Sequence, residues 1–421
     1  MKLSRLRLLR LASVSLLIPL FAIAFAESPT TTSDSTTVNT PIPTAPHEVS
    51  SQVCGSCHVE IFNEWKGSMH AQSTPMADPI HDAFYRKVIG DPKEEGVKKK
   101  GKYPVCLKCH APNAAMQKKT KLDAKPAFAE GVNCVYCHTI SGYKGTTSPE
   151  GKQQLGQAAY VNSTTSLQSP SGKNYTTSAQ ATTPGPADPT FHPFPMEGKH
   201  SAIYKSNEIC LGCHDQRKNF NGVALCNTGN EYADSGSQVN CQSCHMPMVN
   251  GHASHNWAGG HDKNMLRKSL KMQLHVDKAD ANLKAIVTMK NLLPHNFPTG
   301  SPFRNAYLKL VAYNEQGEVV WQNYKTHPMK EDKDAVMYYT LGDGAGKPAM
   351  PPKAKEVLSD TRLKPHEERV MEYKIQGEGI TLVRAEVFYH LLTPKLAESL
   401  DKVLTADLKE TKRVALSEVK L

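Results

Sequence analysis

The chain has 421 residues, of which 39% are hydrophobic and 21% charged, and its formal net charge is +10. This length allows two or three domains, and the composition is that of a folded protein rather than a disordered chain. The charge does not predict nucleic acid as a partner, because four of the cations lie in an N-terminal segment that we expect to be removed.

Residues 1–26 have the pattern of a secretory signal peptide. A basic start is followed by the apolar run Leu11–Phe25 and by the small-x-small cleavage site Ala24-Phe25-Ala26. The run is short for a membrane anchor, which is the alternative interpretation. We therefore expect a periplasmic, secreted or cell-surface protein with no transmembrane segment after cleavage. Residues 27–48 are rich in Ser, Thr and Pro and are predicted to be a disordered tether.

A five-residue pattern, Cys-x-x-Cys-His, occurs five times and uses ten of the 11 cysteines. Chance placement of the same residues would give roughly 0.01 copies. In chain order the copies are motif I (Cys54, Cys57, His58), motif II (Cys106, Cys109, His110), motif III (Cys134, Cys137, His138), motif IV (Cys210, Cys213, His214) and motif V (Cys241, Cys244, His245).

The pattern is typical of covalent haem attachment. Its two thiols add to the vinyl groups of the porphyrin, and the adjoining histidine becomes the proximal ligand of the iron. Structural zinc would not require a histidine after the second cysteine in every copy, and two cysteines three residues apart rarely form an unstrained disulfide. The sequence therefore predicts five covalent haem c groups. Cys226, outside the motifs, is interpreted as a buried free thiol, with a haem ligand or a reactive sulfur as the alternatives.

Residues 49–265 are predicted to form one pentahaem domain of helices and loops, with a flexible loop at 142–190. Hydrophobic residues recur at helical spacing behind motif I and predict a short helix there. Elsewhere in this range little periodicity is sustained, as expected where macrocycles supply most of the core. The spacing of the motifs along the chain pairs motif II with motif III and motif IV with motif V.

Each iron also needs a sixth ligand, and 13 histidines remain outside the motifs. The predicted distal ligands are His70, His200, His255, His261 and His295. Three others are substitutes, namely His81, His192 and His252. If His295 binds iron, it also clamps the C-terminal part of the chain onto a haem.

From about residue 270 the sequence changes to runs rich in Val, Ile, Leu and Tyr, several of which alternate as strands do. We predict an antiparallel β-sandwich over 270–395, followed by a C-terminal helix or tail over 396–421. Residues 314–317 are typical of a hairpin turn, and residues 376–379 are predicted to form another. The fold class is therefore α+β.

Three sets of residues resemble the cytochrome c-554 and c-prime family of multihaem cytochromes. They are Trp65-x-x-Ser68-x-His70 after motif I, the sequence Cys244-His245-Met246-Pro247, and His255 followed by Gly259-Gly260-His261-Asp262. His295-x-Phe297-Pro298-Thr299-Gly300 resembles the start of the C-terminal module of many relatives. The resemblance implies stacked haem pairs, largely bis-histidine ligation and respiratory electron transfer in the periplasm or at the cell surface.

The expected function is single-electron transfer along five largely bis-histidine haems, since two imidazoles close the iron to substrates. One alternative is an enzyme that reduces a small nitrogen or sulfur oxyanion at a five-coordinate haem, but no residue pattern marks such a site. Another alternative is a polymerising extracellular filament, or a smaller homo-oligomer, which the surplus histidines permit.

The expected partners are other cytochromes, or quinol-oxidising or terminal reductase complexes. Without residues 1–26 the net charge falls to +6, and five ferric haems with ionised propionates bring it to about +1. A nearly neutral protein gives no reason to expect binding to nucleic acid.

Overall fold

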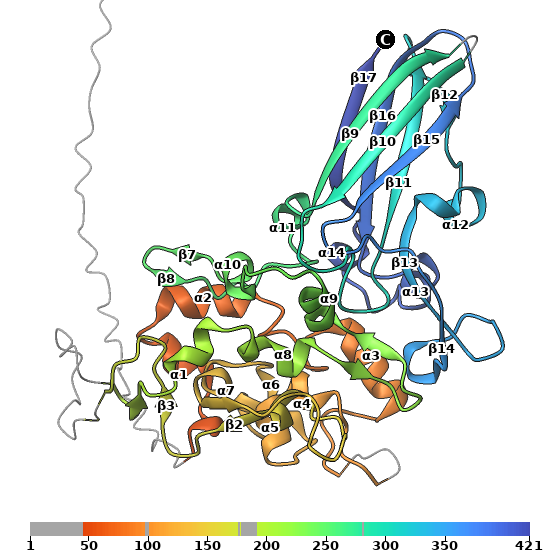
Figure 1. The fold of residues 1–421 in the computed structure, drawn as a ribbon. Coiled ribbons are helices and arrows are strands. Elements are labelled where there is room, and N and C mark those ends of the chain that lie inside the picture. The colour runs from red at the N-terminus through yellow and green to blue at the C-terminus, as the bar shows by residue number, and fades with distance from the viewer. Residues whose placement is uncertain (1–44, 97–100, 176, 178–191, 280–281) are drawn as a thin grey trace, which may run out of the picture. The chain divides into compact units, whose positions relative to one another are not determined.

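The computed structural model describes residues 45–96, 101–175, 177, 192–279 and 282–421. Short helices and loops make up residues 45–267, called here the helical region, and long strands make up most of residues 270–421, called here the strand region (Figure 1). The predicted signal peptide, most of the predicted tether and part of the predicted loop 142–190 lie outside the described residues.

The helical region consists of elements of one to three turns. Its helices are α1 (Ser51–Gly55), α2 (Val59–Gly67), α3 (Pro79–Val88), α4 (Leu107–His110), α5 (Pro112–Met116), α6 (Pro126–Ala129), α7 (Cys134–His138), α8 (Glu208–His214), α9 (Thr228–Asp234), α10 (Cys241–His245) and α11 (Lys263–Arg267). Its short strands form the pairs β1 (Ile140–Tyr143) with β2 (Tyr160–Asn162), β3 (Leu167–Gln168) with β4 (Met196–Glu197), β5 (Arg217–Lys218) with β6 (Ala224–Cys226), and β7 (Met248–Val249) with β8 (His252–Ala253). Among the described residues, no helix is both long and apolar enough to span a bilayer.

Each of the five motifs includes residues of a short helix. In motifs III and V the residue before the first cysteine is an asparagine that caps the helix: the side chain of Asn133 accepts a hydrogen bond from the Tyr136 amide, and that of Asn240 accepts one from the Ser243 amide. On a helix, residues three and four apart lie on one face. The two thiols and the histidine of these motifs are therefore presented together.

The hydrophobic core of the helical region is divided into small clusters. Tyr85, Leu107 and Leu122 belong to a cluster of six buried residues, and Tyr136 and Ile140 belong to one of five. A fully buried core residue ordinarily touches many others within one continuous core. These clusters are too small to form the whole hydrophobic core of a region of this length, so other apolar groups must fill the rest of its interior.

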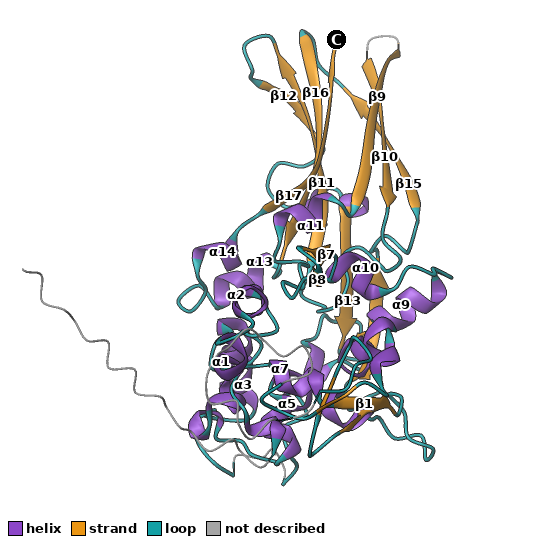
Figure 2. Ribbon diagram, turned by 90° about the vertical axis from the view of Figure 1, so that its left-hand side faces the viewer, coloured by secondary structure: helices purple, strands orange, loops and turns teal. Residues whose placement is uncertain are grey.

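The strand region contains two antiparallel sheets (Figure 2). Its strands are β9 (Leu270–Ala279), β10 (Asn282–Asn291), β11 (Asn305–Asn314), β12 (Val319–Gln322), β13 (Val336–Gly342), β14 (Glu356–Asp360), β15 (Glu368–Ile375), β16 (Ile380–His390) and β17 (Lys412–Lys420), and its helices are α12 (Pro328–Glu331), α13 (Pro394–Ser399) and α14 (Ala406–Lys409). One sheet has the order β15-β10-β9, and the other has the order β14-β13-β11-β16-β17 with β12 paired to β11. The α+β fold class is thereby confirmed.

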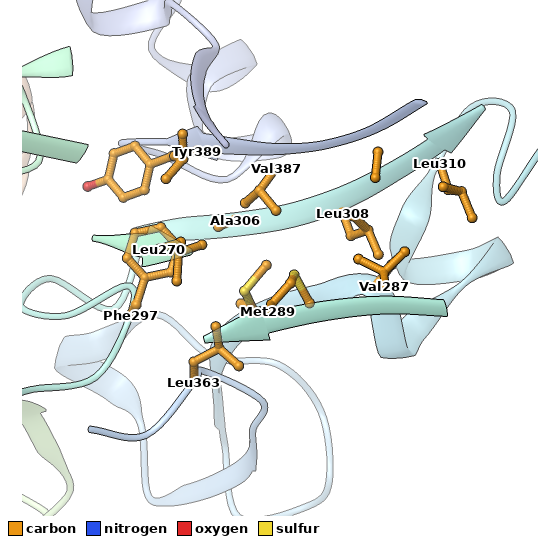
Figure 3. Close-up of a cluster of buried hydrophobic side chains, with 14 of the residues drawn as sticks. Leu270, Val287, Met289, Phe297, Ala306, Leu308, Leu310, Leu363, Val387 and Tyr389 are labelled. Carbon is orange, nitrogen blue, oxygen red and sulfur yellow. The ribbon is translucent and has the colours of Figure 1, made fainter. Parts of the chain in front are cut away.

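One hydrophobic core lies between these two sheets (Figure 3). Val287 and Met289 of β10 belong to the same buried cluster as Leu308 of β11 and Val387 of β16. Alternate residues of β10 and β16 are buried, as expected for strands that present one face to a core. The strands predicted from alternating apolar residues in this range are therefore confirmed for β10 and β16.

Two predictions about the strand region were wrong. Residues 396–421 do not end in a helix or tail, because after the one-turn helix α14 the chain forms β17, which pairs antiparallel with β16. Residues 376–379 do not form a hairpin, because β15 and β16 belong to different sheets and the chain crosses between them. The predicted hairpin turn at 314–317 is confirmed: it joins β11 to β12, and Gly317 has a φ of 79°.

The helical and strand regions contact each other through several side chains. Phe84 of α3 stacks on Phe303, with ring centroids 5.1 Å apart and an interplanar angle of 4°. Glu231 of α9 pairs with Arg362 at 2.8 Å, and it also accepts hydrogen bonds from the Asn296 amide and the Thr299 hydroxyl. These contacts fix the loop 294–300, which carries one of the predicted distal histidines.

Candidate haem-binding site

One continuous cavity of about 3400 Å³ runs through the helical region and reaches the loop 294–300. All ten motif cysteines and all five motif histidines line it. A haem occupies roughly 600 Å³ at the packing density of protein interiors, so five haems need about 3000 Å³. The volume and the side chains that line the cavity therefore fit five covalently attached haems.

The thiols of different motifs lie close together within this cavity. In three pairs the thiols lie close enough to shift each other's pKa: Cys54 with Cys134, Cys109 with Cys213, and Cys210 with Cys241. Cys137 and Cys213 also pack against one buried cluster, which links motif III to motif IV. Motif IV is thus next to motifs II, III and V. The spacing along the chain correctly paired motifs IV and V, but it did not show that motif II contacts motif IV.

None of the 11 cysteines forms a disulfide, and among the described residues no three His, Cys, Asp or Glu side chains gather as a bare metal ion would require. Each motif instead presents two thiols and one imidazole to the cavity. This is the donor set of a covalent haem rather than of a zinc ion.

Backbone carbonyls orient several of the histidines. The Nδ1 atom of His245 lies 2.7 Å from the Ala258 oxygen, and that of His110 lies 3.0 Å from the Ser73 oxygen. A carbonyl only accepts hydrogen bonds, so each Nδ1 must carry the proton. The same arrangement holds for His81, His255 and His295, whose Nδ1 atoms lie 2.7–3.0 Å from a backbone oxygen. In each case the proton on Nδ1 leaves the lone pair of Nε2 free for a metal.

Three motif histidines face a second histidine at one characteristic distance. Ring centroids lie 6.3 Å apart for His58 and His192, 6.1 Å for His70 and His214, and 6.5 Å for His245 and His295. A metal–nitrogen bond of about 2.0 Å and a ring radius of roughly 1.1 Å would place two axial imidazoles of one iron about 6.3 Å apart. All three spacings therefore leave room for an iron between the rings.

The surroundings of the other two motif histidines, His138 and His110, are less regular. After burial, the charge of His255 is the largest influence on the pKa of His138, which is lowered to about 4. His81 and His110 have ring centroids 4.4 Å apart, which is closer than the spacing of two axial ligands. The Nε2 atom of His81 is buried and has no hydrogen-bond partner in the described part of the chain.

Burial lowers the pKa of the paired histidines. It brings the pKa to about 3 for His70 and to about 4 for His81 and His214, and the neighbouring histidine charges around His70 and His214 act in the same direction. The pKa of His110 also falls well below its usual range, first because of burial. A neutral imidazole is the form that binds a metal, so the cavity holds these groups in the state that iron requires.

The structure places the sequence-predicted distal histidines unequally. The rings of His70 and His295 lie beside a motif histidine, and the charge of His255 reaches His138, whereas His200 does not line the cavity and His261 is not stacked on another histidine in the described part of the chain. His81 and His192, the substitutes named from the sequence, lie beside His110 and His58. The Nε2 atom of His252 lies 3.3 Å from a carboxylate oxygen of Glu64 instead. The assignment of any of these residues to an iron stays a prediction, and the geometry favours His81 and His192 over His200 and His261.

A signal for His81 was present in the sequence. Asp78 caps α3 and Pro79 occupies its first turn, so a helix beginning there was predictable, with His81 at its start. His192 had no such signal, because its neighbours Pro193, Phe194 and Pro195 form no periodic element. Only the three-dimensional contact with His58 identifies it.

Comparison with known proteins agrees with this site. A family model described as cytochrome c554 and c-prime matches residues 53–139. The crystal structure of a penta-heme cytochrome c552 from Thermochromatium tepidum is 44% identical in sequence, with a TM-score of 0.82, and the match covers 90% of this chain and all of that one. The fold and the cavity therefore define a multihaem c-type cytochrome. More specifically, the chain belongs with the penta-heme c-type cytochromes, of which this cytochrome c552 is one, and it carries five covalently bound haem c groups.

Two other results add nothing to this assignment. No curated protein sequence matches the chain. A DUF4848 family protein from Bacteroides thetaiotaomicron aligns over 37% of this chain and 42% of its own, but with 9% identity and a TM-score of 0.13 it carries no structural information.

Proposed function

We propose that the protein transfers single electrons along its five haems, that each iron is held by two histidines, and that it works in an exported respiratory pathway. The proposal rests chiefly on one observation, a second histidine ring beside four of the five motif histidines. The charge of His255 also reaches the fifth, His138. An iron with two imidazole ligands has no open position for a substrate, so its chemistry is limited to gaining and losing an electron.

The thiol contacts between motifs support rapid transfer between haems. Because thiols of neighbouring motifs lie close enough to shift each other's pKa, the porphyrin edges that they anchor are also close. The contacts connect motifs I, III, IV and V in one series, with motif II beside motif IV. We infer that electrons enter and leave at opposite ends of this series, and that the partners are other cytochromes, quinol-oxidising complexes or terminal reductases.

The export part of the proposal comes from the sequence. Residues 1–26 have the pattern of a signal peptide, and bacterial haem attachment to Cys-x-x-Cys-His takes place outside the cytoplasm. Fractionation of cells tests it directly. The mature protein should be found in the periplasm or at the cell surface and should begin near residue 27, and a cytoplasmic protein with residue 1 still present would contradict export.

The main test of ligation is the ferrous absorption spectrum of the purified protein with and without carbon monoxide. Five bis-histidine haems should leave the spectrum unchanged, because carbon monoxide binds rapidly only where an axial position is open. A change that corresponds to one haem in five would contradict the proposal.

A matched pair of variants tests the ligand assignment. His192→Ala should convert one haem to the high-spin state, measured by electron paramagnetic resonance, because His192 faces His58 at 6.3 Å. His200→Ala should leave all five haems low-spin, because His200 does not line the cavity. His81→Ala and His261→Ala form a second pair with the same expected difference. The reverse result in either pair would restore the assignment made from the sequence.

One observation favours a second function, reduction of a small oxyanion at a five-coordinate haem. The rings of His81 and His110 are 4.4 Å apart, so the geometry of this pair does not match two axial ligands. If one of the five haems is open, the haem of motif II is therefore the one to examine. Carbon monoxide binding that is abolished only by changes in motif II would support this alternative.

A further inference from the structure

Arg304, just before β11, is a cation without an acidic partner among the described residues. The only hydrogen bond of its guanidinium there runs from Nη1 to the Thr299 carbonyl, at 3.1 Å. A guanidinium has five N–H donors, and a half-buried one usually meets a carboxylate. Arg304 instead lines the haem cavity, so most of its donors remain for a group that the polypeptide does not supply.

The Tyr389 hydroxyl, at the end of β16, faces the same place. The side chain is 2% exposed, and its oxygen is buried without any hydrogen-bond partner in the described part of the chain. Figure 3 shows this oxygen pointing away from the labelled aliphatic side chains of the core. A buried hydroxyl that lacks a partner destabilises the fold, so it normally has one.

Gly260 shows that these two donors converge. A Cβ atom at this glycine would lie 2.4 Å from the Tyr389 hydroxyl and 3.4 Å from Cζ of Arg304. Both groups therefore border a single point on the cavity wall, and any side chain at residue 260 would collide with the tyrosine. At Gly300 a Cβ would lie 3.0 Å from Nη1 of Arg304, so the guanidinium passes between two glycines.

His261 follows Gly260 in the chain and lines the same cavity. An imidazole N–H can donate a hydrogen bond. The place therefore offers one cation and two further donors, which suits a single carboxylate or oxyanion.

We propose that Arg304, Tyr389 and His261 bind one carboxylate or oxyanion, and that the group bound is a propionate of a neighbouring haem. The five haems carry ten propionates, whereas six cationic side chains line the cavity in the described residues. Propionates therefore outnumber the cations that could pair with them, and an arginine there without an acidic partner is available to bind one. Arg304 also lies close enough to the candidate ligands His214 and His295 for its charge to affect both. The inference rests on the presence of five haems and not on the proposed electron transfer.

This arrangement predicts a redox effect. A positive charge near a haem stabilises the ferrous state, so Arg304 raises the potential of the haem whose propionate it holds. Sequence reasoning assigned His261 to an iron, and the cluster gives this residue a different role, as a donor beside the haem.

The test is a potentiometric titration of the holoprotein, after mass spectrometry has confirmed five haems in every variant. Arg304→Gln should move one midpoint potential to a more negative value and leave the other potentials unchanged. Tyr389→Phe removes only the hydroxyl and should shift the same haem in the same direction by less. Arg413→Gln, which removes a cation of β17 paired with Glu386, is the control and should shift none.

A second arm distinguishes the two sources of the anion. Sulfite, nitrite and inorganic phosphate are each titrated calorimetrically into the oxidised wild-type protein and into Arg304→Gln. No binding to either protein, together with the shifted potential, supports the propionate. Binding to wild type that Arg304→Gln abolishes identifies a free oxyanion as the ligand of the same site. Unchanged potentials together with no Arg304-dependent binding would overturn the proposal. Carbon monoxide binding, by contrast, would overturn only the proposed function.

Discussion

The helical and strand regions differ in what fills their interiors. The strand region has one cluster of 24 buried hydrophobic residues, contributed by both sheets. The helical region has clusters of six, five and four buried residues around a cavity of about 3400 Å³. One region is held together by side chains, and the other depends on haems to supply most of its apolar surface. The comparison shows how one chain can combine two folding strategies.

Side chains of both regions contact each other at the junction between them. Phe303 and Arg362 of the strand region contact Phe84 and Glu231 of the helical region. The loop 294–300 then places His295 6.5 Å from His245. The strand region, which has a continuous hydrophobic core, therefore positions His295 as a candidate ligand of a haem in the helical region, which lacks such a core.

The largest expected effect follows from removing a haem. Replacing Cys210 and Cys213 of motif IV by Ala should abolish covalent attachment at the motif that contacts three others. We expect the helical region to lose about 5 kcal/mol or more, comparable with the whole stability of a small domain, because no side-chain core replaces the porphyrin. Limited proteolysis should then cut the helical region and leave a fragment that begins near residue 270.

Cys226→Ala is the matched control for this change, since it removes the cysteine that lies outside the motifs. It should retain five haems by mass and the protease resistance of the wild type. If the motif IV variant resisted proteolysis as well as this control does, the helical region would have a core of its own and the contrast between the regions would be wrong.

A smaller effect is expected from creating a cavity in the strand region. Leu308 is fully buried in the core between the sheets. Leu308→Ala should lower the free energy of unfolding of this region by about 2–5 kcal/mol, measured by denaturant titration of the fluorescence or of the far-ultraviolet circular dichroism. The haem absorption spectrum should not change, because the lost packing lies away from the cavity.

Leu416→Ala, on the same pair of sheets, is the control. Leu416 is 44% exposed on β17, so its truncation should cost no more than about 0.5 kcal/mol. Equal losses for Leu308→Ala and Leu416→Ala would show that the core between the sheets does not determine the stability of the strand region.

How much the sequence predicts differs between the two regions. Covalent attachment is encoded locally, so the residues of all five motifs could be read without any knowledge of the fold. The strands of the strand region were also predictable, because burial on one face leaves alternation in β10 and β16. β17 was missed since its exposed and buried residues include charged ones, among them the buried Lys412, and they give no clear apolar alternation.

The neighbours of the motif histidines could not be read in the same way, because they come from distant parts of the chain. His192 lies beside His58, and His81 of α3 lies beside His110 of α4. His261 was chosen because it lies in a histidine-rich stretch after motif V, and its assignment to an iron stays a prediction. Local sequence carries no signal for a contact between residues that are far apart in the chain.

The junction between the two regions supplies the third prediction. Glu231 and Arg362 have side chains that are 6% and 12% exposed, so Glu231→Ala leaves a mostly buried guanidinium with Asp360 as its remaining acidic partner. We expect a loss of about 2 kcal/mol in the free energy of unfolding and a freer loop 294–300, since the hydrogen bonds to the Asn296 amide and the Thr299 hydroxyl disappear too. Electron paramagnetic resonance of the haem beside His245 and His295 measures the second effect.

The surface pair of Arg384 and Glu418 is the control, with both side chains 36% exposed. Glu418→Ala should cost less than about 1 kcal/mol and should leave the haem signals unchanged. A haem signal that was equally insensitive to Glu231→Ala would mean that the loop is positioned by other contacts.

The smallest expected effect is a pH dependence within the strand region that owes nothing to haem. Glu331, at the end of α12, accepts hydrogen bonds from the Lys325, Thr326 and His327 amides and from the Thr326 hydroxyl. These bonds, led by the one from the Lys325 amide, lower the pKa of the Glu331 carboxyl to about 2. A depressed folded-state pKa means that the carboxylate stabilises the fold above its ordinary pKa of 4.5 and loses this contribution as the pH falls towards 2.

Glu331→Gln should therefore reduce the dependence of the free energy of unfolding on pH between these values, measured by denaturant titration at each pH. The control is Glu378→Gln, on the exposed turn after β15, which should not reduce it. If both variants retained the wild-type dependence, the hydrogen bonds to Glu331 would not form in solution, and this turn would not be held by side chains in the way that the rest of the strand region is.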